Sequence, residues 1–156
     1  MTRHTPVGAE CVTEYVTVVL DGQWFGLPIA RVQGVFMPEL LTRVPLSEPE
    51  IAGVLNLRGR IVTAVDLRCR LGLSPRQHGL PPMAVGIEWR GESYGLLVDA
   101  VGGVIKLADS GREPNPVNLD AKFARVSVSV HRLDARLVVV LDVEQVLGSA
   151  AEPIAA

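Results

Sequence analysis

Ser129, His131 and Asp134 are the residues whose types and spacing come closest to a catalytic set. A nucleophilic triad needs a base held between a hydroxyl and a carboxylate. Ser129 and His131 would lie on one face of a strand, because side chains two residues apart share a face. Nothing in the surrounding sequence suggests an oxyanion hole. We therefore interpret the three as a polar cluster at the end of a hairpin, with a hydrolytic or small-molecule-binding site as the minor alternative.

Asp66 and Asp142 could be interpreted as a pair of catalytic acids. Each of them stands where an apolar strand pattern gives way to a short helical pattern, so its carboxylate can accept hydrogen bonds from the first helical turn. Helix capping is the better explanation. The chain has no phosphate-binding glycine motif, and Cys11 and Cys69 lack metal-type spacing. We predict that the protein is not an enzyme and has no catalytic residue, cofactor or metal.

The segment Asn56-Leu57-Arg58-Gly59-Arg60 places two arginines at the tip of a predicted hairpin, between two apolar strands. Charged residues at a turn are commonly no more than solvated. An arginine also presents a rigid fork of donors that suits carboxylates or backbone carbonyls of a partner. The residues alone slightly favour the solvated turn and leave recognition open.

The elements that would position these residues occur twice. Residues 60–72 (RIVTAVDLRCRLG) align with residues 136–148 (RLVVVLDVEQVLG), and residues 25–35 align without a gap with residues 94–104. Each alignment contains five identical positions. Self-similarity of this kind indicates a duplicated structural unit.

Short β-branched runs, separated by glycine turns such as Asp21-Gly22, predict about five strands in each half of the chain. Closing each half into a barrel would remove exposed strand edges. We expect a mainly β fold of two five-stranded barrels packed together, with short helices. One domain at 12–150 would contain subdomains 12–73 and 83–148 and a linker at 74–82, with strand exchange between them left open. Residues 1–11 and 149–156 are expected to be flexible tails.

The composition limits the classes of function. Of 156 residues, 48% are hydrophobic and 21% are charged, and the net charge is −2. Such a chain can form a core but offers no clustered basic face for nucleic acid. No apolar run approaches the roughly 20 residues that cross a bilayer, and the first residues lack a signal-peptide pattern. We expect a cytoplasmic protein that neither binds nucleic acid nor inserts into a membrane.

Residues 53–68 (GVLNLRGRIVTAVDLR) resemble the core signature of the CheW coupling proteins of bacterial chemotaxis. Residues 18–35, 94–101 and 137–147 are similar to further stretches of that family, so the resemblance covers roughly residues 15–147. It implies two SH3-like barrels and a non-catalytic scaffold or adaptor in a two-component system. The partners would be the cytoplasmic helical tip of a methyl-accepting chemoreceptor and the regulatory domain of a CheA-type histidine kinase.

The resemblance also implies roles for individual residues. Gly59 would preserve the hairpin, and the protein would be recruited from the cytoplasm to membrane-associated receptor arrays. Five positions match family positions implicated in receptor coupling: Val32, Gly53, Arg58, Gly95 and Val104.

Two positions depart from the family pattern. Gly34 stands where many members carry an acidic residue, and Thr63 stands where proline is common. The change at Gly34 removes a charge from the expected receptor-facing surface. An adaptor of a non-flagellar chemosensory pathway, serving surface motility or gene regulation, is therefore the alternative function.

Overall fold

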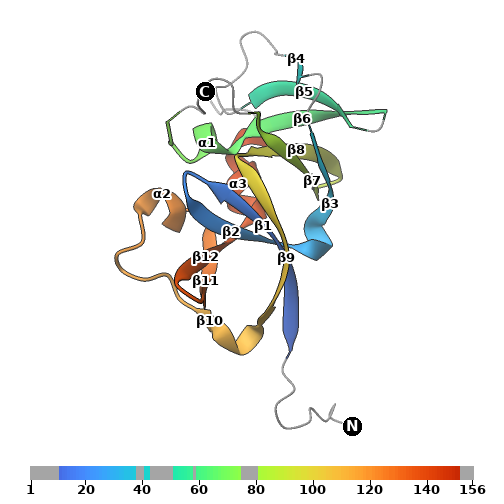
Figure 1. Ribbon diagram of the computed structural model, residues 1–156. Coiled ribbons are helices and arrows are strands. Elements are labelled where there is room, and N and C mark those ends of the chain that lie inside the picture. Colours follow the sequence, from blue (N-terminus) through green and yellow to red (C-terminus); the bar gives the residue numbers. More distant parts are fainter. Residues whose placement is uncertain (1–10, 38–40, 43–50, 58, 75–80, 152–156) are drawn as a thin grey trace.

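The computed structural model describes residues 11–37, 41–42, 51–57, 59–74 and 81–151, which form two six-stranded sheets (Figure 1). The terminal sheet has the order β10 (Arg112–Glu113), β11 (Ser127–Leu133), β12 (Arg136–Leu141), β2 (Gln23–Pro28), β1 (Val12–Leu20) and β9 (Ala100–Ala108). The central sheet has the order β3 (Val32–Phe36), β7 (Met83–Trp89), β8 (Glu92–Val98), β6 (Arg60–Asp66), β5 (Ile51–Leu57) and β4 (Leu41–Thr42).

The helices are short and connect the strands. They are α1 (Leu67–Arg70), α2 (Ala121–Ala124) and α3 (Val143–Ala151), with 3-10 turns at Ile29–Arg31 and Asp109–Gly111. None of these described helices is long and apolar enough to cross a membrane. The sequence pattern did not predict α2, which begins after Asp120, whose carboxylate accepts from the Lys122 N–H at 2.9 Å.

The prediction of a mainly β fold with short helices is confirmed. Each sheet has one strand more than the five expected, and in each the additional strand is a two-residue edge strand, β4 or β10. The segment Ile29–Phe36 consists of the 3-10 turn Ile29–Arg31 followed by β3. Gly102-Gly103 forms a bulge, because β9 shifts register there against β1 and Gly103 has a φ of +100°.

Neither sheet is built from one half of the chain. β1 and β2 join strands that begin at residue 100, whereas β7 and β8 join β3 to β6. The halves 12–73 and 83–148 therefore each contribute strands to both sheets. The chain passes between the sheets at Ile29–Arg31 and again at Asp99.

The two sheets nevertheless have the same topology. When the central sheet is followed from β4 to β3, each strand occupies the place of its counterpart in the terminal sheet. The parallel pair β6–β8 aligns Ala64 with Gly95, and the parallel pair β12–β2 aligns Val140 with Gly26. These four residues are equivalent positions of the sequence repeat. The repeat is thus structural, but each sheet combines a hairpin from one half of the chain with strands from the other half.

The equivalent hairpins β1–β2 and β7–β8 also turn alike. Asp21 and Gly22 have φ values of +51° and +79°, and Arg90 and Gly91 have +52° and +79°. Two successive residues with positive φ match the twist of antiparallel strands, which is why such turns favour glycine, asparagine and aspartate. Arg90 adopts this backbone without being one of these residues.

The largest apolar cluster draws on both sheets and on α1 and α3. Phe25 and Val139 enter it from the terminal sheet, and Ile87 and Leu96 enter it from the central sheet. A fully buried side chain of this size contributes roughly 1.5–3 kcal/mol. Two smaller clusters belong to one sheet each, around Tyr15, Leu107 and Val140 in the terminal sheet and around Leu55, Val62 and Leu97 in the central sheet.

Candidate functional site

The residues expected to contact a receptor differ in exposure. Val104 on β9 is 52% exposed, whereas Val32 on β3 is partly buried. Gly53 on β5 and Gly95 on β8 are both buried. Arg58 lies outside the described residues, so its assignment stays a prediction. Among the four described positions, Val104 presents the most side-chain surface to a partner.

Val104 has an equivalent on the other sheet. It lies on β9, the edge strand of the terminal sheet, and Val35 lies at the matched position of β3, the edge strand of the central sheet. Val35 is 39% exposed. Exposed apolar side chains are a common feature of binding surfaces when they are grouped. The two edge strands are therefore the first candidates for contact with a partner.

The two buried glycines are constrained by their own surroundings, and their assignment to receptor contact stays a prediction. A Cβ at Gly95 would come within 3.3 Å of Leu55 Cδ1 in the small cluster of the central sheet. Gly53 has a φ of +147°, a backbone conformation that residues with side chains rarely adopt. A substitution at either position would disturb the packing or backbone of the central sheet, so its effect on a binding surface would be indirect.

Gly34 has a local packing reason. A Cβ there would come within 2.7 Å of Phe36 Cζ, so any side chain would require the Phe36 ring to move. The same ring lies 3.1 Å, at its Cε2, from a Cβ placed on Gly86. The absence of the acidic residue common in the family is therefore coupled to the position of Phe36.

The hairpin between β5 and β6 is held by its own residues. Gly59 has a φ of +82°, and its N–H donates to Asn56 Oδ1 at 2.9 Å. Arg60 follows it as the first residue of β6 and is exposed. Arg60 Nη2 donates to Ser93 Oγ at 3.2 Å, which directs the guanidinium across the central sheet.

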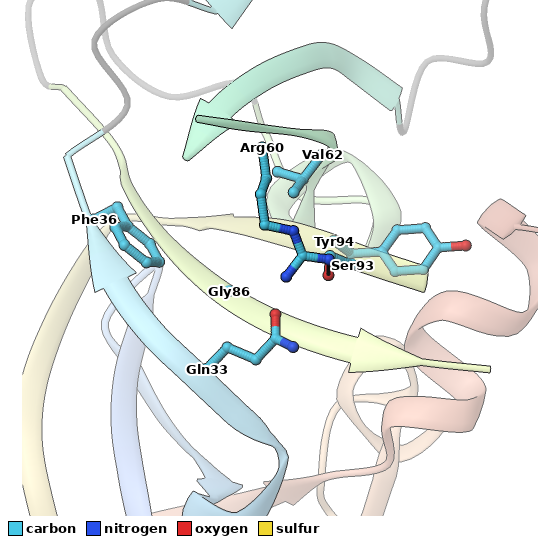
Figure 2. Close-up of a pocket in the computed structure, with 7 residues that line it drawn as sticks. All are labelled: Gln33, Phe36, Arg60, Val62, Gly86, Ser93 and Tyr94. Atoms are coloured by element: carbon cyan, nitrogen blue, oxygen red, sulfur yellow. Dashed lines mark hydrogen bonds between the residues drawn. The ribbon is translucent and has the colours of Figure 1, made fainter. Parts of the chain in front are cut away.

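Arg60 lies over a pocket of about 350 Å³ in the central sheet. Figure 2 shows its guanidinium facing Gln33, which enters from β3 on the opposite side, with Phe36 further along the same strand. The remaining lining residues come from β6, β7 and β8: Val62, Gly86, Ser93 and Tyr94. The pocket thus combines apolar walls with one guanidinium, one amide and one hydroxyl.

Sequence analysis identified the hairpin but not this pocket. Arg60 was considered only as the neighbour of Arg58, and Gln33, Phe36 and Ser93 carried no signal of their own. They come from strands far apart in the chain. Only the pairing of β3 with β7 and of β8 with both β7 and β6 brings them together.

Asp66 and Asp142 accept hydrogen bonds at the beginnings of two helices. Asp66 Oδ1 accepts from the Arg68 N–H at 3.1 Å, and Asp142 Oδ1 accepts from the Glu144 N–H at 3.0 Å. These are the bonds of helix N-caps. Among the described residues, no group of three or more histidine, cysteine, aspartate or glutamate side chains could hold a metal ion.

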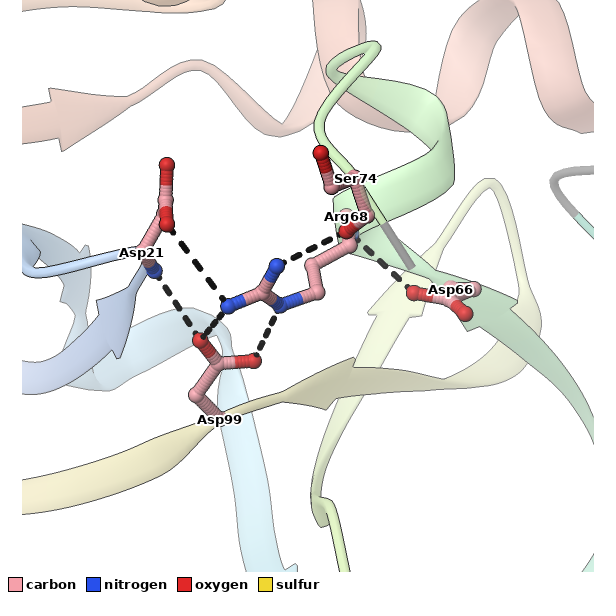
Figure 3. A network of polar contacts seen from close by, with 5 residues as sticks. All are labelled: Asp21, Asp66, Arg68, Ser74 and Asp99. Atoms are coloured by element: carbon pink, nitrogen blue, oxygen red, sulfur yellow. Dashed lines mark hydrogen bonds and ion pairs between the residues drawn. The ribbon is translucent and has the colours of Figure 1, made fainter. Parts of the chain in front are cut away.

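Arg68 on α1 connects the two sheets through polar contacts with Asp99 and with Asp21 in the β1–β2 turn (Figure 3). Its Nε and Nη2 donate to the two carboxylate oxygens of Asp99, each at 2.7 Å, and its Nη1 donates to the Ser74 carbonyl at 2.7 Å. Asp99 also accepts from the Asp21 N–H in the β1–β2 turn at 2.9 Å. The hydrogen bond to Asp99 raises the pKa of Arg68, although burial acts in the opposite direction.

Ser129 and His131 do share a face, but the proposed hairpin-end cluster is wrong. β11 continues to Leu133, so both side chains are buried, with 4% and 2% exposure, whereas Asp134 lies on the exposed turn beyond. Ser129 Oγ and His131 Nε2 have no hydrogen-bond partner among the described residues. None of the three residues lines the pocket under Arg60.

Burial has a consequence for His131. It lowers the pKa of the imidazole from its ordinary value of 6.5, and Arg112 lowers it further, while Asp109 and Glu113 act in the opposite direction. The ring of Tyr15 lies 5.9 Å away between centroids. At neutral pH the fold therefore favours the neutral form of His131.

Comparison with known proteins gives a consistent result. A family model of the CheW-like domain matches residues 14–151. The chemotaxis protein CheW of Thermotoga maritima is 28% identical over 134 residues, which are 86% of this chain and 87% of that protein. The chemotaxis protein CheW of Bacillus subtilis is 29% identical over 133 residues, 85% of either chain. The crystal structure of scaffolding protein TtCheW from Thermoanaerobacter tengcongensis is similar with a TM-score of 0.75 and 27% identity, covering 84% of this chain and 89% of that one.

Replacing Asp99 by asparagine should lower the free energy of unfolding by about 2 kcal/mol, because hydrogen bonds to a charged partner are lost at a mostly buried site. The side chains of Arg68 and Asp99 are only 14% and 22% exposed. Glu113→Gln is the matched control, since its pair with Arg132 has side chains 43% and 62% exposed. It should cost less than about 1 kcal/mol. Urea unfolding measures both, and equal losses would contradict the role of the network.

The neutral His131 predicts a loss of stability in acid. The unfolded chain binds a proton near pH 6.5, whereas the folded chain binds it only at lower pH, so stability falls as pH drops below about 6.5. The melting temperature of the wild type should therefore fall more between pH 7 and pH 5 than that of His131→Leu. Ser129→Ala, buried on the same face, should keep the wild-type slope. Parallel curves for the wild type and His131→Leu would refute the explanation.

Proposed function

The chain belongs to the CheW-like domain family, and on that premise we propose that it is a non-catalytic adaptor of bacterial chemotaxis. In this proposal it couples the cytoplasmic helical tip of a methyl-accepting chemoreceptor to the regulatory domain of a CheA-type histidine kinase. The mechanism is binding alone. The protein resides in the cytoplasm and is recruited to membrane-associated receptor arrays.

The family match over residues 14–151 carries this proposal, because it spans strands of both sheets. An adaptor needs two surfaces held at a fixed separation. The core shared by the sheets and the Arg68–Asp99 pair support such rigidity. The description of the similar Thermoanaerobacter protein as a scaffolding protein agrees with a role in assembly.

The receptor contact is proposed on the exposed edge strands. Val104 on β9 is the best-exposed described position of the family set, and Val35 offers an equivalent apolar side chain on β3. A helical partner can bury such residues along its apolar face. Arg58 would add a guanidinium that suits carboxylates or carbonyls of the partner.

Gly34 favours a second candidate within the same family. The residue lacks the charge that many members carry there, and the Phe36 ring occupies the space that a side chain would need. A receptor that recognises the charged residue would bind this surface less well. An adaptor of a non-flagellar chemosensory pathway, serving surface motility or gene regulation, is therefore the alternative.

The small-molecule-binding or hydrolytic alternative has little support. It requires a polar cavity around Ser129, His131 and Asp134. The first two are buried, with Oγ and Nε2 unpaired within the described part of the chain, and the third lies on an exposed turn.

The variant Val104→Asp should weaken co-sedimentation with receptor-containing membranes at least about tenfold, because a charge would be buried in an apolar contact. Its melting temperature should change little, since the side chain is 52% exposed. Val128→Asp is the matched control: it is also a strand valine, 56% exposed, and lies on β11. It should bind receptor membranes like the wild type. Equal binding by the wild type and both variants would remove Val104 from the receptor surface.

A further inference from the structure

The pocket under Arg60 has a filled counterpart in the same molecule. Because the two sheets share topology and register, each lining residue has an equivalent in the terminal sheet. Arg60 corresponds to Arg136 and Ser93 corresponds to Trp24. Next to the equivalent arginine, the central sheet therefore has a serine where the terminal sheet has a tryptophan.

In the terminal sheet the tryptophan side chain occupies this place. The Arg136 guanidinium carbon lies 4.2 Å from the centroid of the Trp24 ring, a cation–π arrangement. An edge of the ring approaches β9 so closely that a Cβ at Gly102 would come within 2.5 Å of Trp24 Cζ3. The indole thus packs against a guanidinium and a glycine.

In the central sheet the arginine remains but the ring is missing. Ser93 is too short to reach across the sheet, and the space beneath Arg60 is the pocket of about 350 Å³ (Figure 2). Gln33 stands at the position equivalent to Gly102, and its amide points into the opening. Arg60 uses one donor on Ser93 Oγ at 3.2 Å. The central sheet therefore has a cavity under Arg60 at the place where the terminal sheet has the Trp24 ring under Arg136.

We propose that this pocket receives an aromatic side chain projected by a partner protein, stacked against Arg60 as Trp24 is stacked against Arg136. The volume is at the lower end of the roughly 300–1,000 Å³ of ligand sites, which suits one side chain better than a cofactor. Phe36 and Val62 supply the apolar walls. The Ser93 and Gln33 oxygens are placed to accept a hydrogen bond from an indole N–H or a phenol O–H.

A second copy of this chain is a poor source of the ring. All seven aromatic residues of types Phe, Trp and Tyr lie within the described part of the chain, and each of them is buried or partly buried. The aromatic group must therefore come from a different protein. An aromatic residue is well suited to this role, since it brings a large contact area with few rotatable bonds.

N-acetyl-tryptophanamide is the probe, because it carries the indole on a peptide-like backbone. Titrated into isotope-labelled full-length protein, it should shift the amide NMR signals of Arg60, Gly86 and Ser93, with a dissociation constant on the order of millimolar. N-acetyl-leucinamide and N-acetyl-glutamate amide are the comparison probes. They should bind at least about fivefold more weakly, because neither offers a ring to the guanidinium.

The variant Ser93→Trp should fill the pocket with the chain's own indole and reduce probe binding at least about tenfold, with the native NMR spectrum otherwise retained. Ser110→Trp, which adds an indole at an exposed position of the 3-10 turn Asp109–Gly111, is its matched control and should bind the probe like the wild type. Arg60→Met keeps the pocket but removes the cation, and it should weaken binding roughly two- to fivefold. This variant also tests the proposal if Ser93→Trp fails to fold.

Several results would overturn the proposal. They are an absence of shifts around Arg60 at millimolar probe, equal binding by Ser93→Trp and the wild type, and tighter binding of the acidic or aliphatic probe. Binding of free indole without binding of N-acetyl-tryptophanamide would also overturn it, because the pocket would then admit a small molecule but not a side chain attached to a backbone.

Discussion

Two parallel strand pairs, β2 with β12 and β6 with β8, are the constraint on which the rest of the structure depends. Each pair joins strands from different halves of the chain. Without the first pair the terminal sheet would separate into β9, β1 and β2 on one side and β10 to β12 on the other. Gln23 Nε2 reinforces this junction by donating to the Leu137 carbonyl at 2.7 Å. The core between the sheets draws on both strands of each junction, with Phe25 and Val139 at one and Val65 and Leu96 at the other.

Each copy of the repeat has an ion pair between its helix and the turn of a neighbouring hairpin, but the two copies place the positive and negative residues the other way round. In one copy Arg68 on α1 lies 3.9 Å from Asp21 in the β1–β2 turn, and in the other Glu144 on α3 lies 3.9 Å from Arg90 in the β7–β8 turn. The sign at each position has exchanged, but the pair remains complementary. The duplicated frame thus fixes where side chains meet, while their chemistry has diverged independently on each sheet. The contrast between Trp24 and Ser93 has the same origin.

The repeat was sufficient to predict the fold but not its connectivity. Strand positions follow from local β propensity and glycine turns, which sequence shows directly. Which strands become neighbours depends on long-range packing, so the exchange of partners was left open. His131 was misjudged because β11 extends past it, and burial depends on the neighbouring strands. The pocket under Arg60 could not be predicted, because Gln33 and Ser93 acquire meaning only when the two sheets are compared.

The exchanged strands also set an order of events during synthesis. Gln23 and Leu137, which meet at the β2–β12 junction, are 114 residues apart, and the first hairpin leaves the ribosome long before its parallel neighbour exists. At about 5–20 residues per second, that interval is roughly 5–25 seconds. During this time the edge of β2 that pairs with β12 has no native partner. During synthesis the β1–β2 hairpin is therefore accessible to a chaperone or to another nascent chain until β12 has been made and has paired with β2.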